Sequence, residues 1–160
     1  MSYDNDALAR LESRIEIEEL KARYFRYLDT KNWTGLRSVY TDDATFTARG
    51  VVHRGADAVV AFIESQLRPD VTSIHHGHMP EIEITNDRAT AIWAMEDTIN
   101  RPDGTGFHGC GHYHDRYERT ADGWKIAEST LSRLVFEPAA GRLADDERRP
   151  PELANRATPA

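Results

Sequence analysis

The chain has 160 residues, of which 39% are hydrophobic and 29% charged, as expected for one globular domain with a sizeable core. Its 20 Lys and Arg residues against 27 Asp and Glu residues give a net charge of −7, which argues against a general nucleic-acid or anionic-membrane binder. The single cysteine, Cys110, excludes an intramolecular disulfide, and no stretch approaches the roughly 20 apolar residues of a membrane span.

The first elements along the chain are expected to be helical. Residues 1–10 are polar and lack the apolar core of a signal peptide, which favours a cytoplasmic protein. Leu8 and Leu11 suggest a short leading helix, and a capping box at Ser13 starts a second one. The second helix reaches Asp29 and carries an apolar stripe at helical spacing. The stripe consists of Ile17, Leu20, Tyr24 and Leu28.

A short helix, a small hairpin and a third helix follow. The pattern predicts the short helix over 36–40 and hairpin strands over 44–48 and 51–53, joined by a turn at Arg49-Gly50. The third helix, over 56–67, begins after Gly55.

The second half changes to the alternating pattern of strands. Four long strands are predicted over 71–84, 89–99, 107–118 and 124–136, joined by tight turns. Pro80 lies inside the first of them, which favours a bulge and an edge position. Helices followed by long antiparallel strands indicate an α+β fold, in which a curved antiparallel sheet wraps around the N-terminal helices and encloses a hydrophobic pocket.

Domain boundaries and assembly follow from the same pattern. We expect one domain over 1–137, followed by a C-terminal tail over 138–160 that is rich in Pro, Ala and Arg. The tail is expected on the surface or against a neighbouring subunit. Because the curved sheet leaves one face exposed, we expect a homo-oligomer.

Two residues on distant elements are candidates for acid–base chemistry. Asp29 is either a solvated residue at a helix end or a buried carboxylate beside Tyr24, which would need a partner. His75 and His76 are adjacent on a strand, so only one of them faces the pocket. A lone strand histidine is more often structural. An aspartate bonded to one ring nitrogen, however, fixes the tautomer and leaves the other nitrogen as a general base near neutral pH.

Four side chains on one strand face invite a metal hypothesis. Alternate residues on a strand lie about 7 Å apart, so three or four of them cannot converge on one tetrahedral zinc ion. We therefore predict no metal site and interpret this face as a polar surface, on solvent or against another subunit. The four residues are His108, Cys110, His112 and His114.

The positions of several further polar and small residues each allow two interpretations. Asp97 follows two apolar residues on one strand face and is either a pocket group or a residue near solvent. Arg133 shares a strand face with Ser129 and either enters the pocket or forms a surface ion pair. Gly109 and Gly111 leave space in mid-strand for a ligand or for curvature of the sheet.

Several short motifs, in their order and spacing, resemble one protein family over about residues 8–137. The chain resembles the SnoaL-like group of the nuclear-transport-factor-2-like superfamily, the cystatin-like α+β cone, and within it cofactor-free lyases of the hexachlorocyclohexane dehydrochlorinase and bile-acid 7α-dehydratase type. The motifs are IEELKARY at 17–24, YLD at 27–29, VYTDDA at 39–44, HRG at 53–55, IHHG at 74–77, GHYHDRYER at 111–119 and GWKI at 123–126.

The resemblance implies roles for particular residues. Asp29 corresponds to the carboxylate of an Asp–His dyad, His75 to its base, and Tyr24 to a polar pocket residue. Asp97 corresponds to an acidic pocket position, and the pocket arginine of the dehydrochlorinase falls at Ser129. Arg133 lies four residues further on the same face and is the candidate replacement. The expected pocket walls are Phe46, Trp93, Met95 and Tyr113.

The sequence and the resemblance together predict a cofactor-free lyase, similar to a dehydratase, that acts on a small hydrophobic substrate without a metal. The resemblance also favours a trimer, with a dimer as the alternative. A ketosteroid-type isomerase, a polyketide cyclase, a non-catalytic binding module and a metal-dependent hydrolase are the alternative functions, because this fold hosts many activities.

Overall fold

The helices of this protein come early in the chain, and most of its sheet comes late. The computed structural model describes residues 2–140, with the side chains of residues 5–138. Within this range the elements are helices α1 (Ser2–Thr30), α2 (Trp33–Ser38) and α3 (Ala56–Gln66), and strands β1 (Tyr40–Ala48), β2 (Val51–Arg54), β3 (Thr72–Thr85), β4 (Arg88–Asn100), β5 (Thr105–Thr120) and β6 (Gly123–Ala140).

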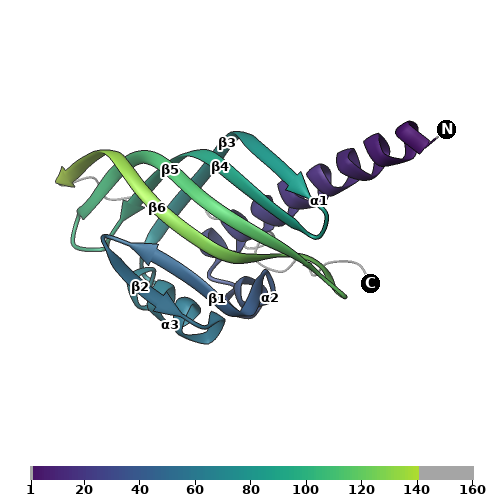
Figure 1. The fold of residues 1–160 in the computed structure, drawn as a ribbon. Coiled ribbons are helices and arrows are strands. Elements are labelled where there is room, and N and C mark those ends of the chain that lie inside the picture. Colours follow the sequence, from purple (N-terminus) through teal and green to yellow (C-terminus); the bar gives the residue numbers. More distant parts are fainter. Residues whose placement is uncertain (1, 141–160) are drawn as a thin grey trace.

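All six strands form one curved sheet in the order β2-β1-β6-β5-β4-β3. Figure 1 shows β3 to β6 arching over the helices, with α3 beneath β1 and β2. The expected α+β cone is confirmed. The sheet is mixed rather than wholly antiparallel, because β1 runs parallel to β6, and all other pairings are antiparallel.

Alternation along the strands decides which side chains face the helices. On β4 every second residue is buried, from Ala89 through to Ile99, and the intervening residues are more exposed. This period of two gives the sheet one inner, mostly apolar face and one outer, polar face. The inner face packs against the stripe of α1, whose members Ile17, Leu20 and Leu28 are all buried.

Helix α1 is continuous, contrary to the expected break at Ser13. The Ser13 hydroxyl donates a hydrogen bond to the carbonyl of Ala9, 2.7 Å away and one turn back, so the serine is satisfied inside the helix and caps nothing. The N-terminal part of α1 projects beyond the sheet (Figure 1), which leaves Leu8 and Leu11 more than half exposed.

The edges and ends of the sheet match the sequence expectations in most respects. Strand β3 is an edge strand, and its pairing with β4 shifts between His78 and Glu81, which confirms the bulge expected around Pro80. Strand β6 runs on to Ala140, into the start of the expected tail. The remainder of that tail, 141–160, lies outside the described residues.

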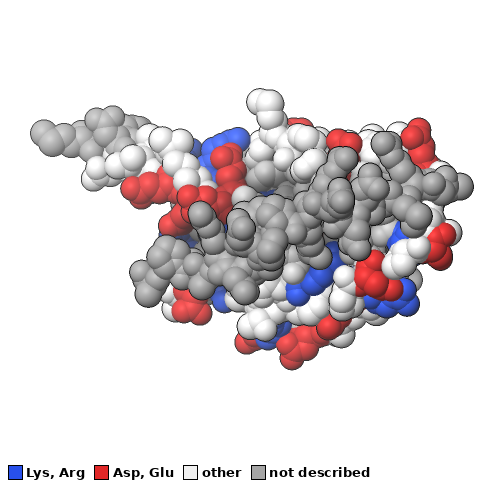
Figure 2. Space-filling model, turned by 180° about the vertical axis from the view of Figure 1, so that it is seen from behind, with Lys and Arg blue, Asp and Glu red and all other residues white. Residues whose placement is uncertain are grey.

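The visible surface carries both signs of charge. Viewed from behind, acidic and basic side chains are interspersed over the described part of the molecule, without one large basic area (Figure 2). Among residues 2–140, none of the helices combines the length and the apolar character needed to cross a bilayer.

Candidate functional site

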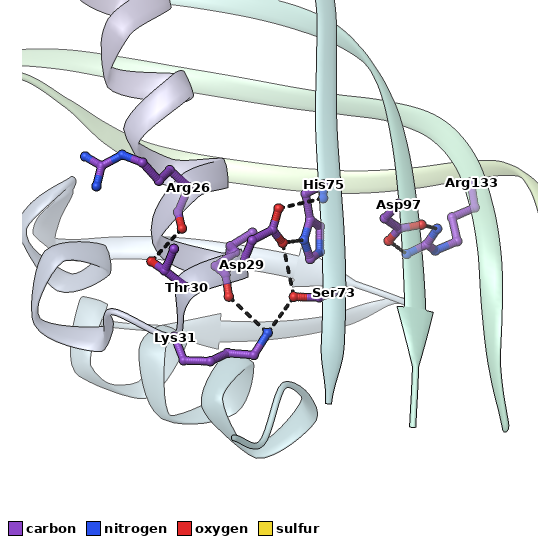
Figure 3. A network of polar contacts seen from close by, with 9 residues as sticks. Arg26, Asp29, Thr30, Lys31, Ser73, His75, Asp97 and Arg133 are labelled. Carbon is purple, nitrogen blue, oxygen red and sulfur yellow. Dashed lines mark hydrogen bonds and ion pairs between the residues drawn. The ribbon is translucent and has the colours of Figure 1, made fainter. Parts of the chain in front are cut away.

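The end of helix α1 meets the edge strand β3 through Asp29 and His75. Asp29 Oδ1 lies 2.7 Å from His75 Nδ1, and Asp29 Oδ2 accepts a hydrogen bond from the His75 backbone N–H at 2.9 Å (Figure 3). The hydroxyl of Ser73 donates a third hydrogen bond to Asp29 Oδ1 at 3.1 Å. The carboxylate therefore binds both the main chain and the imidazole of His75, which leaves Nε2 as the ring nitrogen that can exchange a proton with a substrate.

The supports of this pair come from the same local segments. Ser73 shares the inner face of β3 with His75, two residues away, and its hydroxyl accepts a hydrogen bond from Lys31 Nζ at 2.5 Å. Lys31 has a φ of 58°, in the left-handed region that terminates helices, and its amine also bonds the Leu28 carbonyl at the end of α1. His76, as expected, points to the outer face and is exposed.

A second carboxylate, Asp97, lies one strand from His75. Asp97 is directly opposite His75 in the β3–β4 register, and such opposed residues have Cβ atoms about 5 Å apart. Both Asp97 oxygens bond the guanidinium of Arg133, with Oδ1 2.6 Å from one terminal nitrogen (Figure 3). The Asp97 side chain is 3% exposed and that of Arg133 is 20% exposed. Both residues belong to the pocket.

Gly109 makes room for this ion pair. It is directly opposite Asp97 in the β4–β5 register, and a Cβ there would overlap an Arg133 nitrogen and come within 2.6 Å of Asp97 Oδ1. A Cβ at Gly111 would instead meet the backbone of Ser132, beside the register shift of β5 and β6. Neither glycine leaves space for a ligand: Gly109 accommodates the Arg133 guanidinium, and Gly111 accommodates the close approach of β6 beside the register shift.

Gly109→Ala is therefore expected to push Arg133 away from Asp97 and to lower the free energy of unfolding by about 1–3 kcal/mol, because a buried carboxylate loses its partner. Urea unfolding checks this value. In an Arg133→Ala background, the same glycine substitution should cost less than half as much. An equal loss in both backgrounds would contradict the assignment of Gly109 to the ion pair.

These groups face a cavity of about 380 Å³ enclosed by the helices and the sheet. His75, Asp97 and Arg133 contribute polar atoms to its wall. Most of the remaining lining is apolar or aromatic, and it includes Tyr24, Leu28, Phe46, Phe62, Ile63, Ile99, Phe107, Tyr113 and Leu131. The volume and the lining suit a small, largely apolar molecule.

Two tyrosines line this cavity. Tyr24 on α1 and Tyr113 on β5 are almost fully buried, and their rings meet edge to face with centroids 5.9 Å apart. Burial raises the pKa of both hydroxyls well above the ordinary value, so both stay protonated and can donate hydrogen bonds. Tyr24, Phe46 and Tyr113 thus lie where the sequence placed them.

Three expected lining residues lie elsewhere. Trp93 borders a second hollow between α1 and β3, which His75 also lines, and it donates its indole N–H to the Tyr117 hydroxyl at 3.0 Å. Met95 packs in the core, and Ser129 is fully buried; neither contributes to the cavity wall. The alternation of β4 and β6 put all three on the inner face correctly, but the inner face is longer than the cavity, and helix α1 covers the rest of it.

The structure contains a buried polar network that the sequence pattern did not indicate. Lys21 Nζ bonds Asp115 Oδ2 at 2.7 Å, and both side chains are fully buried. The Tyr117 hydroxyl donates to the same Asp115 oxygen at 2.7 Å. Burial lowers the pKa of Lys21, whereas Asp115 raises it. The ammonium also lies over the Tyr24 and Tyr113 rings, 4.3 and 4.0 Å from their centroids, so it supports the tyrosines of the cavity.

The histidine-rich strand face lies on the outside of the sheet. His108 Nε2 lies 2.9 Å from Glu96 Oε1, and this contact holds the pKa of Glu96 below its usual value. Cys110 Sγ is 3.8 Å from His108 Nε2. Within residues 2–140, no three His, Cys, Asp or Glu side chains are arranged to hold a metal ion.

Comparisons with known proteins agree with the fold. The SnoaL-like domain family matches residues 9–130. A protein of Gibberella zeae, named a probable cyclase, is 26% identical over 136 residues, which are 76% of this chain and 91% of the relative. A solved type 2 hexachlorocyclohexane dehydrochlorinase superposes with a TM-score of 0.78 at 25% identity, covering 88% of this chain and 99% of the other.

The fold itself is shared with more distant structures. An NTF2-like protein with a cystatin-like fold from Novosphingobium aromaticivorans superposes with a TM-score of 0.67 at 21% identity, over 84% of this chain and 90% of the other. The match to the family profile extends over most of the chain, from the first third of α1 into β6. This chain belongs to the SnoaL-like family, with an NTF2-like fold.

Proposed function

We propose that this protein is a cofactor-free lyase that takes a carbon-bound proton from a small hydrophobic substrate and expels water or another leaving group. The observation that carries the proposal is the 2.7 Å contact of Asp29 with His75 at the wall of a largely apolar cavity. Relatives that include a dehydrochlorinase and a probable cyclase support an enzymatic role.

In the proposed reaction, His75 Nε2 takes the proton, and the electrons of the C–H bond move toward a neighbouring carbonyl oxygen. Asp29 holds the Nδ1 proton and stabilises the imidazolium. The hydroxyls of Tyr24 and Tyr113 donate hydrogen bonds to the developing oxyanion. The leaving group then departs from the adjacent carbon as the double bond forms, and a leaving hydroxide takes up the proton from His75 to leave as water.

The second pair, Asp97 and Arg133, would orient the substrate. Its polar atoms lie on the cavity wall next to His75, where Arg133 can anchor an oxygen or an anionic group of the substrate. Because Asp97 already occupies the guanidinium, we assign the pair to orientation of the leaving group or carbonyl rather than to proton abstraction.

The second candidate is a cofactor-free cyclase or isomerase, favoured by the similarity to a probable cyclase. The same dyad and tyrosines would form and stabilise the enolate, and no group would leave. A non-catalytic binding module would not need Asp29 and His75 to touch, so their hydrogen-bond contact supports the catalytic proposal. The homo-oligomer, as a dimer or trimer, and the cytoplasmic location stay predictions.

Incubation of the protein with a panel of cyclic β-hydroxy ketones in D₂O, followed by mass spectrometry, tests the proposal. A lyase gives products that lack one water. A cyclase or isomerase gives products of unchanged mass apart from deuterium taken up from solvent. Substrates that emerge with neither deuterium nor a changed structure, across the whole panel, would contradict proton abstraction by this site.

A further inference from the structure

One residue that lines the cavity, His53, has a buried polar atom without a partner. His53 lies on β2, opposite Phe46 of β1, and its ring stacks on the Phe62 ring of α3, with centroids 3.8 Å apart and planes 16° apart. Within residues 2–140, its buried Nε2 makes no hydrogen bond. A buried ring nitrogen without a partner is costly, whereas a bound ligand atom would satisfy it.

His53 lies across the cavity from the dyad. Strands β2 and β3 are the two opposite edges of the sheet, and the sheet curls so that His53 of one edge and His75 of the other line the same cavity. The wall between them is mostly apolar, with Phe46, Ile63 and Leu131. A ligand that reaches both histidines therefore has an apolar body with a polar group at each end.

The charges around the cavity indicate the nature of the second polar group. Arg49 and Arg101 also line it, and in the described part of the chain neither forms an ion pair. The one acidic residue in the lining, Asp97, is already bonded to Arg133. A chain with a net charge of −7 thus has two cavity-lining arginines without a carboxylate in ion-pair contact, which favours an anionic ligand group.

We propose that His53, together with Arg49 and Arg101, forms a subsite for a carboxylate on the substrate, remote from the carbon that reacts. This proposal rests on the proposed function for the position of the reacting end, and it names the substrate class as an apolar ring system that carries a carboxylate. His53 binds one carboxylate oxygen through Nε2, and the arginines supply charge.

Binding of matched naphthalene probes tests this subsite without requiring turnover. The probes are 2-naphthol, 6-hydroxy-2-naphthoate and the neutral 6-hydroxymethyl-2-naphthol, each measured by isothermal titration calorimetry on the full chain. Wild type should bind the carboxylate probe about tenfold more tightly than 2-naphthol. In His53→Phe, which keeps an aromatic ring on Phe62, this ratio should fall to about twofold or less, while the Kd of 2-naphthol stays within about twofold.

Two further variants complete the test. Arg101→Met should also reduce the ratio, and His112→Phe, on the outer face of the sheet, should leave it unchanged. Equal binding of all three probes by wild type, no binding of any, or a ratio that survives in His53→Phe would overturn the proposal. If the neutral hydroxymethyl probe bound as much more tightly than 2-naphthol as the carboxylate probe does, the assignment of an anionic substrate group would be overturned. Intact probe selectivity without deuterium uptake in the D₂O experiment would instead refute the proposed reaction.

Discussion

Replacement of His75 with alanine is expected to lower the rate of proton abstraction by about 10²–10⁴-fold, because the substitution removes the general base. Asp29→Asn should reduce the rate through another route: the amide still contacts the ring but no longer carries the charge that stabilises an imidazolium. Rates of deuterium uptake into a substrate found in the D₂O panel, measured at saturating concentration, give both values.

The control for His75→Ala is His76→Ala on the same strand. His76 is the next residue along β3 but faces outward and is exposed, so its removal should leave the rate within about twofold of wild type. Both variants should keep thermal stability close to that of wild type. If His75→Ala retained more than a tenth of the activity while folded, His75 would not be the base.

Lys21→Met is expected to destabilise the fold by about 3–5 kcal/mol, because it leaves the Asp115 carboxylate fully buried without its cation. For a chain of this length, such a loss corresponds to a fall in Tm on the order of 10 °C. Thermal and urea unfolding measure it directly. Cavity binding should weaken as well, since the ammonium lies over the Tyr24 and Tyr113 rings.

Two comparisons separate the buried pair from a general effect of removing a lysine. The double variant Lys21→Met/Asp115→Asn should recover more than half of the lost stability, because no unpaired charge remains and the amide oxygen still accepts from Tyr117. Lys125→Met removes a lysine whose partner, Asp122, is 83% exposed at 3.9 Å, and it should cost less than about 1 kcal/mol. Similar losses in Lys21→Met and Lys125→Met would show that the buried pair has no special role.

The features of the site that depend only on local sequence periodicity were predictable from the sequence. Alternation allowed only one of His75 and His76 to face inward, and the end of the α1 stripe placed Asp29 at the helix exit; that the inward residue is His75 came from the family resemblance. That these two residues meet followed only from the family resemblance, because periodicity cannot say which helix end approaches which strand. The alternatives at Asp97 and Arg133 stayed open for the same reason, since their pairing depends on strand register across β5.

The sequence did not predict features that depend on a hydrogen-bond or ion-pair partner from another part of the structure. Lys21 lies inside the apolar stripe, four residues after Ile17 and three before Tyr24, and that spacing was a usable signal of burial. Ser13 had the spacing of a helix cap, but a serine also satisfies itself inside a helix. That His53 Nε2 has no hydrogen-bond partner depends on the curvature of the sheet, and no local sequence pattern indicates it.

The parallel pairing of β1 with β6 has a consequence for how the protein is made. It joins the first strand of the sheet to the last, so the ladder next to the β1–β2 hairpin forms only after nearly the whole described chain has left the ribosome. Until then Phe46 of β1 has no β6 beside it, and the cavity lacks a wall. A nascent chain would therefore begin to bind ligand only when β6 has been synthesised. Ligand binding measured on chains of increasing, defined length would then appear in a single late step.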